Sequence, residues 1–291
     1  MHDFDFLEPS ALSEVCQLAE QWGDDARLIA GGTALMLALR QRLVSPSCLI
    51  SVACVPELRG IHVNEQDVLT IGAFTTHSEV AQSPLVRERY PMLAAMASQV
   101  ANWQVRNQGT IGGNLCYADP ATDPPGCLLA LGAEVVLQGV SHQRVLPMAE
   151  FLVDYYETAI QAGEVLVAIR LPAPIANSHG SYLRYLKTPA DHRPVMNVSV
   201  TSTWTSTSSG DVVGDVNLVI GAATPFPVRL GAGEALFSQK PSLALVQSVA
   251  QAASQEMDAL SDARATSDYR RDLARVLVAR ALTQHFNLSN M

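Results

Sequence analysis

Apolar residues recur at helical spacing in several stretches of the chain, and short apolar runs lie between them. This pattern predicts helices within residues 9–22 and 91–107. Residues 25–43 are typical of a short strand, a glycine turn and a helix, residues 46–55 of a strand, and residues 67–83 of a strand that turns into a helix. The first half therefore predicts α/β units, in which ligands usually bind at the loops between elements.

Residues 122–137 predict a helix start, a helix and a strand. Asp123 is a candidate N-cap, and Pro124 and Pro125 suit the first helical positions because proline lacks the N–H that those positions leave unpaired. Gly132 can end this helix, since glycine readily adopts the left-handed conformation found there.

The second half of the chain has a different pattern. Residues 164–172 predict a strand that prolines terminate, and residues 172–181 have the Pro, Asn, Ser and Gly content of a linker. Residues 195–223 alternate apolar and small polar side chains across a Ser-Gly-Asp turn, which predicts an antiparallel hairpin. Helices are expected within residues 241–257 and 267–286. We place a domain boundary near residue 175, with a sheet covered by helices after it.

Composition excludes several classes of protein. The chain has 291 residues, of which 48% are hydrophobic and only 16% are charged, so a well-buried core is expected. The net charge of −9 argues against binding to nucleic acid, because that affinity comes mainly from Lys and Arg. An acidic protein that binds a phosphate-bearing ligand must neutralise it locally, with backbone amides rather than bulk charge.

The cysteines and histidines do not predict a metal site. Five cysteines lack any C-x-x-C spacing, which favours a reducing compartment, and seven histidines form no metal-binding pair. The N-terminal residues lack the basic start and apolar run of a signal peptide, and no stretch is long and apolar enough to span a bilayer. We therefore expect a cytoplasmic protein without a membrane span.

Two glycine pairs are the main candidates for a binding site. They lie in "LIAGGTALML" at residues 28–37 and in "GTIGGN" at residues 109–114, where Thr33, Thr110 and Asn114 add polar side chains. One glycine pair alone could be a tight turn without a ligand, since short glycine motifs are weak signals. Two such loops favour a diphosphate, which carries two anionic groups that separate sets of amides can hold.

Other residues allow two interpretations of their role or give little indication of function. Asp123 could cap its helix, or it could accept hydrogen bonds from a ribose. His77 is interpreted as a turn or capping residue. The chain has no G-x-S-x-G elbow, no P-loop and no G-x-G-x-x-G fingerprint, which argues against hydrolases and kinases.

Taken together, these motifs resemble a known family, the FAD-binding medium subunits of molybdenum hydroxylases such as xanthine dehydrogenase and aerobic carbon monoxide dehydrogenase. Their order and spacing match the family over nearly the whole chain. The stretches that carry the resemblance are "AGGTALMLALRQRL" from residue 30, "TIGAFTTHSEVAQSP" from residue 70, "VANWQVRNQGTIGGNLCYADPATDPPGCLLALGAEVVL" from residue 100, "YLRYLKTPAD" from residue 182 and "YRRDLARVLVARAL" from residue 269.

The resemblance implies an α+β fold of the vanillyl-alcohol-oxidase type. Residues 1–175 would form an FAD-binding domain of two α/β subdomains, split near residue 55, and residues 176–291 a small antiparallel sheet with helices. It further implies that the FAD diphosphate is held by Ala30, Gly31, Gly32, Thr33, Ala34 and Leu35 on one side and by Thr110, Gly112, Gly113 and Asn114 on the other.

By the same resemblance, Asp123 would lie near the adenosine half of FAD, and Val100, Ala101 and Leu166 near the flavin ring. The family usually has a lysine in a Y-x-K pattern close to the polar edge of the ring. Here Arg184 stands at that spacing and Lys187 three residues later, so the sequence leaves the identity of the cation open.

The function implied is electron transfer within a complex. The molybdenum cofactor would lie on a large partner subunit and [2Fe-2S] clusters on a small one, with no metal on this chain and a dimer of heterotrimers as the assembly. The sequence specifies neither the small-molecule substrate nor the terminal acceptor. Two alternatives stay open: a stand-alone FAD reductase of the enolpyruvyl-glucosamine reductase type, and an assembly subunit with an empty flavin site.

Overall fold

The structure, a computed structural model, describes residues 3–188, 191–208 and 210–288. These residues fold into two compact units, and each unit is built from separate stretches of the chain. The first unit comprises the chain up to Leu85 together with Asn102–Asp119 and Gly132–Ala173. The second comprises Val86–Ala101, Pro120–Leu131 and the chain from Pro174 onward.

The first unit contains a three-stranded sheet, a five-stranded sheet and a two-stranded sheet with short helices between them. Its strands are β1 (Asp5–Leu7), β2 (Ala26–Ile29), β3 (Cys48–Ser51), β4 (Ile61–Val63), β5 (Leu69–Gly72), β6 (Glu134–Gln138), β7 (Gln143–Pro147), β8 (Leu152–Asp154), β9 (Glu157–Thr158) and β10 (Val165–Leu171). Its helices are α1 (Leu12–Trp22), α2 (Leu35–Arg40), α3 (His77–Gln82), α6 (Trp103–Gln108), α7 (Ile111–Tyr117) and α9 (Met148–Phe151), with 3₁₀ turns η1 (Gly23–Asp25) and η2 (Pro56–Leu58).

The three-stranded sheet is parallel, in the order β1-β3-β2, and its central strand β3 is buried along its whole length. Parallel strands need crossover connections, and α1 provides the one between β1 and β2. Val15 and Cys16 of α1 are buried in the same apolar cluster as Cys48 and Ile50 of β3. This burial fixes the end of β2, from which the first glycine loop departs.

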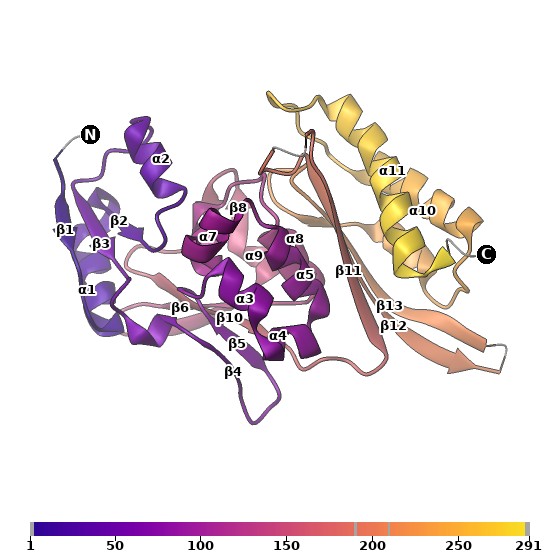
Figure 1. Cartoon of the computed structure of the whole chain (residues 1–291), viewed down its shortest axis with the longest axis horizontal. Helices are drawn as coiled ribbons and strands as arrows, with labels where there is room; N and C mark the ends of the chain where they lie inside the picture. The colour runs from indigo at the N-terminus through magenta and orange to yellow at the C-terminus, as the bar shows by residue number, and fades with distance from the viewer. Residues whose placement is uncertain (1–2, 189–190, 209, 289–291) are drawn as a thin grey trace. The chain divides into compact units, whose positions relative to one another are not determined.

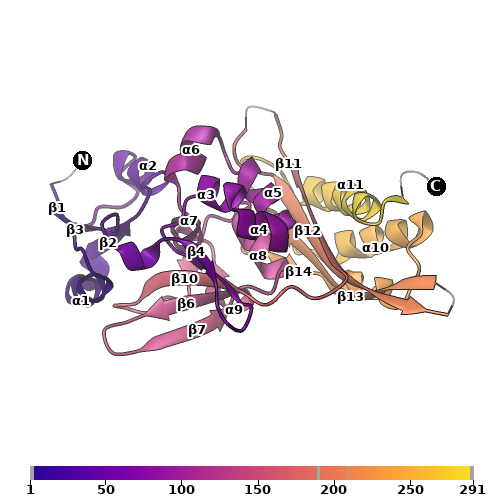
Figure 2. The ribbon, with the colours of Figure 1, turned by 60° about the horizontal axis from the view of Figure 1, so that its bottom comes forward.

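The five-stranded sheet is antiparallel, in the order β4-β5-β10-β6-β7 (Figure 2). Its central strand β10 pairs with β5 on one side and β6 on the other, and Ile169 at its middle is fully buried. The chain leaves β5 at Gly72 and runs through residues 73–76 into α3. Three of these four residues, Ala73, Thr75 and Thr76, contact the second glycine loop through backbone hydrogen bonds and a β-bridge.

The second unit is built on a four-stranded antiparallel sheet in the order β11-β12-β13-β14 (Figure 1). Residues paired across antiparallel strands point to the same face, so the register defines the two faces of this sheet. Its elements are α4 (Pro84–Arg89, which begins at the end of the first unit), α5 (Pro91–Gln99), α8 (Pro124–Ala130), β11 (Ser178–Tyr185), β12 (Met196–Thr207), β13 (Gly210–Gly221), β14 (Val228–Arg229), η3 (Gly231–Leu236), α10 (Leu243–Glu256) and α11 (Ser267–His285).

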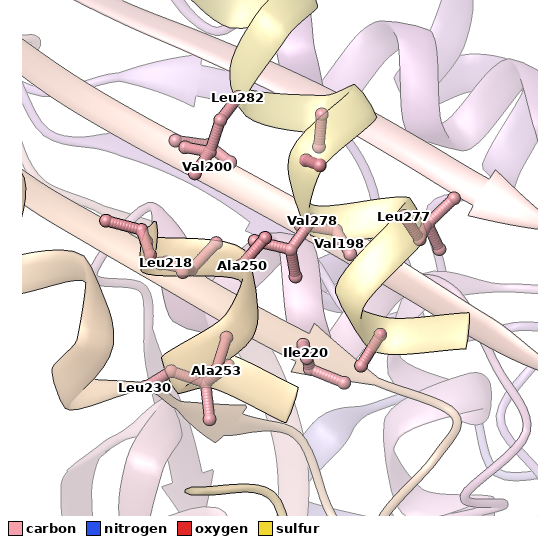
Figure 3. Packing of buried hydrophobic residues seen from close by; sticks show 14 of the residues in the cluster. Val198, Val200, Leu218, Ile220, Leu230, Ala250, Ala253, Leu277, Val278 and Leu282 are labelled. Carbon is pink, nitrogen blue, oxygen red and sulfur yellow. The ribbon is translucent and has the colours of Figure 1, made fainter. Parts of the chain in front are cut away.

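One face of this sheet is apolar and lies under the two C-terminal helices. Figure 3 shows Val198 and Val200 of β12 and Ile220 of β13 among side chains of α10 and α11, including Val278. All four of these side chains are fully buried. Burying apolar surface stabilises a fold by about 25 cal/mol per Å², so this layer stabilises the second unit.

The opposite face of the sheet is polar and carries α5 and α8. Asn197 of β12 donates a hydrogen bond through Nδ2 to the carbonyl oxygen of Thr122 (2.9 Å), and Thr201 Oγ1 donates one to the carbonyl oxygen of Ala130 (3.0 Å). The second bond satisfies a carbonyl group in the last turn of α8, where helices leave carbonyls unpaired, and the first holds the residue that precedes the N-cap of α8. The polar residues of β12 therefore fix a helix that precedes the expected linker in sequence.

The structure confirms the α+β class and shortens the linker expected at residues 172–181, because β11 already begins at Ser178. It also corrects one predicted helix. Residues 91–107 form two helices, because the chain breaks at Ala101, whose φ is +42°, and α6 then starts behind the N-cap Asn102. The Oδ1 atom of Asn102 accepts a hydrogen bond from the amide of Val105 (2.9 Å). Asparagine is a strong N-cap, and this local bond outweighs the apolar periodicity that predicted one continuous helix.

The domain boundary near residue 175 remains a prediction, and the structure adds that the compact units are not contiguous in sequence. The helices α5 and α8 precede that position but belong to the second unit. A Cβ on Gly180 of β11 would lie 3.2 Å from Cβ of Met92 of α5, so the strand and the helix are in close contact.

Candidate functional site

The two glycine loops, more than seventy residues apart in sequence, are in direct contact within the first unit. A Cβ on Gly31 would lie 1.9 Å from the carbonyl oxygen of Gln108. A Cβ on Gly109 would lie 3.2 Å from Thr33 Oγ1, and one on Gly113 would lie 3.7 Å from Cβ of Ala30. Residues 30–35, the first loop, and residues 109–114, the second loop, therefore form one continuous surface.

The first loop presents a row of unpaired amides. It connects the end of β2 to the start of α2, and Gly32 at its centre has a φ of +67°, a conformation that glycine adopts without steric cost. Within the described part of the chain, the backbone N–H groups of residues 31–35 donate no hydrogen bond, and neither does the Thr33 hydroxyl. Five consecutive donors without acceptors are suited to an anionic ligand.

The second loop differs from the expectation that it would also present free amides. Residues 111–117 form the short helix α7, and Thr110 is its N-cap, with Oγ1 accepting a hydrogen bond from the amide of Gly113 (3.1 Å). The amide of Gly112 donates to the carbonyl oxygen of Ala73 (3.0 Å), and that of Asn114 to the carbonyl oxygen of Thr110 (3.0 Å). The amides of residues 111–114 are therefore paired within the protein, whereas those of the first loop are not.

The glycines of the second loop are required for contact between protein segments. A Cβ on Gly112 would lie 2.6 Å from both Cβ and O of Ala73, so any larger residue would push α7 away from the segment that follows β5. That segment holds the loop through an isolated antiparallel bridge between Thr76 and Thr110 and a hydrogen bond from the amide of Ile111 to the carbonyl oxygen of Thr75 (2.9 Å). The glycine pattern was visible in the sequence, but this reason for it was not.

His77, interpreted from the sequence as a turn or capping residue, does not cap its helix. It is the first residue of α3, and the cap of that helix is Thr76, which forms a capping box with Glu79. The His77 side chain is only 2% exposed. Burial, together with the nearby positive charge of Arg106, lowers the pKa of His77 to about 4, so its ring is neutral at neutral pH.

Asp123 does not cap α8 with its side chain, although it stands at the N-cap position. Its carboxylate instead accepts hydrogen bonds from the hydroxyl of Tyr182 and from Nη1 of Arg184 (3.0 Å), both on β11. Burial raises the pKa of the Asp123 carboxyl, and the Arg184 charge and the Tyr182 bond oppose that rise. The structure thus brings Asp123 and Arg184 together as a buried ion pair within the second unit.

The remaining residues assigned to the flavin ring lie in different parts of the structure. Leu166 is a buried residue of β10 in the first unit. Val100 is buried and Ala101 is at the chain break before α6, both in the second unit, where Lys187 is exposed after β11. Their contact with a flavin ring stays a prediction, as does the position of Asp123 near the adenosine half.

The comparison with known proteins decides the family. Residues 2–174 match the family described as FAD binding domain in molybdopterin dehydrogenase, and residues 181–285 match the CO dehydrogenase flavoprotein C-terminal domain. The chain belongs to this family. It is an oxidoreductase subunit whose cofactor is FAD, and the unpaired amides of the first loop fit the diphosphate of that cofactor.

Relatives and solved structures cover nearly the whole chain. The carbon monoxide dehydrogenase medium chain of Hydrogenophaga pseudoflava is 32% identical over 96% of each chain. The 6-hydroxypseudooxynicotine dehydrogenase complex subunit alpha of Paenarthrobacter nicotinovorans is 30% identical, covering 97% of this chain and 94% of that one. The crystal structure of quinoline 2-oxidoreductase from Pseudomonas putida 86 matches with a TM-score of 0.91 and 27% identity, over 100% of this chain and 99% of that one.

The described residues provide no metal site of their own. Among residues 3–188, 191–208 and 210–288, no group of three or more His, Cys, Asp or Glu side chains is arranged to hold a metal ion. In the same residues no helix is both long and apolar enough to cross a membrane.

Proposed function

We propose that this chain carries electrons within a heteromeric molybdenum hydroxylase, from iron–sulfur clusters of a small partner subunit to a terminal acceptor. The single observation that carries the proposal is the row of unpaired amides at residues 31–35, braced by the second loop. Bound FAD supplies the redox chemistry, because it accepts and releases electrons, while the protein binds and orients it. Five neutral donors hold a diphosphate without the excess of basic residues that this acidic chain lacks.

The partners follow from membership of the family. We propose a large subunit that carries the molybdenum cofactor, a small subunit that carries [2Fe-2S] clusters, and a dimer of such heterotrimers. The relatives described above support this assignment, since their names are those of chains or subunits of larger enzymes. The printed names of these relatives refer to carbon monoxide, 6-hydroxypseudooxynicotine and quinoline. Similar chains thus occur with chemically unrelated substrates, so we assign substrate choice to the large subunit.

For the flavin site itself, we propose that residues 30–35 bind the diphosphate and that the second loop closes one side of it. The first loop offers donors to anionic oxygens, and Thr33 adds a hydroxyl that is unpaired within the described chain. The Gly31 contact with Gln108 sets how the two loops meet, so the donors are held in place before the cofactor arrives. Such preorganisation lowers the entropic cost of binding.

The test is purification of the tagged chain from cells that express its natural neighbours. We expect about one FAD per chain and co-purification of molybdenum- and iron-bearing subunits. In a complex that carries Gly31→Val, FAD content should fall, the iron–sulfur clusters should still be reduced by substrate, and electron delivery to the acceptor should be lost. A chain that purifies without FAD would overturn the flavin assignment, and FAD without metal-bearing partners would favour the stand-alone reductase.

A further inference from the structure

The main chain of His77 is fixed to the second loop. Its backbone N–H donates a hydrogen bond to the carbonyl oxygen of Gly109 (3.1 Å), and the preceding residue, Thr76, forms the bridge with Thr110. The neighbouring helices α3 and α6 also contact each other through the Ser78 hydroxyl and the Asn107 side chain. The position of the His77 ring is therefore set by the same contacts that shape the loop.

The His77 ring is buried without a hydrogen-bond partner. Its Nδ1 atom is fully inaccessible and has no partner, and Nε2 makes no hydrogen bond to any residue that the structure describes. Buried polar atoms are nearly always paired, and an unpaired one costs free energy that the fold must compensate. An unpaired ring at this place is consistent with a partner that is not part of the polypeptide.

The ring lies where the two glycine loops meet. The point at which a Cβ on Gly109 would stand is 3.5 Å from Cδ2 of His77 and 3.2 Å from Oγ1 of Thr33. Cδ2 is bonded to Nε2, so this edge of the ring faces the same side of Gly109 as the first loop. His77 therefore lies close to the side chain of Thr33, which belongs to the first loop.

The ring adds an acceptor to a site that otherwise offers mainly donors. Backbone amides can only donate hydrogen bonds, whereas FAD carries hydroxyl groups on the sugar chains beside its diphosphate, and these need acceptors. A neutral imidazole has one donor and one acceptor nitrogen, and nothing in the described chain fixes which nitrogen carries the proton.

We propose that His77 is a binding residue for FAD, which accepts a hydrogen bond from a sugar hydroxyl next to the diphosphate while residues 31–35 hold the diphosphate oxygens. This inference rests on the proposed flavin site and adds a residue and a contact to it. The hydroxyl bonds to Nε2, because Nδ1 is fully inaccessible, and this bond places the ring proton on Nδ1.

The experiment measures FAD affinity and the stability of the FAD-free full-length chain. His77→Phe removes both ring nitrogens and keeps an aromatic ring, and His62→Phe, at an exposed histidine of β4 in the same unit, is the matched control. We expect the Kd for FAD to rise about tenfold in His77→Phe, equivalent to about 1.4 kcal/mol, and to stay unchanged in His62→Phe. His77→Gln, which keeps one donor and one acceptor, should restore part of the affinity.

The stability of the FAD-free chain separates a binding role from a structural one. Because His77→Phe removes a buried unpaired polar group, we expect the unfolding midpoint of the FAD-free chain to stay level or rise. An unchanged Kd, with or without a lower midpoint, would overturn the inference and leave the flavin site intact. A wild-type chain that binds no FAD would overturn the proposed function itself.

A second measurement needs no variant that alters the loop. With ¹⁵N-labelled histidine in the wild-type full-length chain, NMR reports the proton position on each ring nitrogen. We expect the His77 nitrogens to shift on titration with FAD toward a single tautomer, while those of exposed His62 stay unchanged. Unshifted His77 nitrogens at saturating FAD would overturn the inference.

Discussion

Gly31 lies so close to the main chain of Gln108 that a Cβ on Gly31 would stand 1.9 Å from the Gln108 carbonyl oxygen. Real Cβ atoms do not approach that closely, so any side chain at Gly31 must separate the two loops. The glycine therefore serves the contact between the loops, and the flavin site depends on it indirectly.

Replacing Gly31 should separate flavin binding from general stability. Gly31→Ala is expected to reduce the FAD content of the purified chain at least about tenfold, because the first loop must move away from the backbone that braces it. Gly23→Ala is the control, since Gly23 has a φ of +50° and a Cβ added there would meet no atom within 4 Å. That control should lose about 1–3 kcal/mol of stability, because its φ of +50° and ψ of −130° are readily adopted only by glycine, and it should leave FAD content unchanged. Equal FAD content in the two variants would contradict the prediction.

Asp123 and Arg184 compensate each other's charge, so removing one partner alone should destabilise the second unit. Asp123→Asn leaves the guanidinium buried without its counter-charge, and we expect the free energy of unfolding to fall by about 3 kcal/mol. Adding Arg184→Leu should recover most of that loss, because the uncompensated charge is then removed. Urea titration of the wild-type chain, both single variants and the double variant gives the coupling energy. Additive losses would show that the two side chains act independently.

Protonation of His285 should lower the free energy of unfolding of the second unit in mild acid. Its Nδ1 and Nε2 atoms lie 2.9 Å from Ser181 Oγ and 2.7 Å from Ser202 Oγ, and burial, with a smaller effect of His179, lowers the pKa of His285 to about 3. Because the folded pKa lies below the unfolded value of 6.5, the unfolded chain binds the extra proton first. The second unit should therefore lose on the order of 3–4 kcal/mol as pH falls from about 6.5 to 3.

A His285→Gln variant provides the control for that prediction. It keeps polar contacts for both serines but does not titrate, so its unfolding midpoint should depend less on pH between about 6.5 and 3. An identical pH dependence in the variant and the wild type would assign the acid sensitivity to other groups.

Protonation of Glu164 should lower the free energy of unfolding of the first unit at lower pH. Its carboxylate accepts two hydrogen bonds from Arg144 (2.6 and 2.7 Å), and these bonds contribute most to lowering its pKa from 4.5 to about 2. The folded pKa lies below the unfolded one, so this stabilisation is complete above about pH 4.5 and is lost as pH falls toward 2. Allowing for solvent screening, the loss is on the order of 1–2 kcal/mol.

Glu164→Gln should remove most of that pH dependence and lower the stability at neutral pH. The measurement is thermal unfolding of the first unit, followed over a pH series. A wild-type midpoint that does not change between about pH 4.5 and 2, after correction for His285, would contradict the role of Glu164.

The sequence predicted the strongly periodic elements well and the interrupted ones poorly. The hairpin of β12 and β13 and the helices α10 and α11 follow patterns in which each side chain has one environment, so alternation or helical spacing was enough to place them. The chain break at Ala101 lies inside an apolar stretch, and only the capping preference of Asn102 signals it. Local hydrogen bonds of this kind compete with periodicity and are hard to weigh from sequence alone.

The sequence predicted the two glycine loops, but not which of them has unpaired amides. Both loops have a pair of adjacent glycines, and only the three-dimensional structure shows that the first leaves its amides unpaired while the amides of residues 111–114 in the second are paired within the protein. The interpretation of Asp123 as a cap was also reasonable, since Pro124 starts the helix as expected. Its true partners on β11 lie about sixty residues away, and no local pattern connects them to it.

The two units are interleaved in sequence, and this affects how the chain folds during synthesis and which fragments proteolysis can release. The chain passes from one unit to the other five times, at residues 85/86, 101/102, 119/120, 131/132 and 173/174. During synthesis, α8 emerges long before β12, which supplies the Asn197 and Thr201 bonds at its two ends. The second unit therefore cannot be completed until the C-terminal part of the chain is made, and proteolysis at residue 173 would release a C-terminal fragment without α5 and α8.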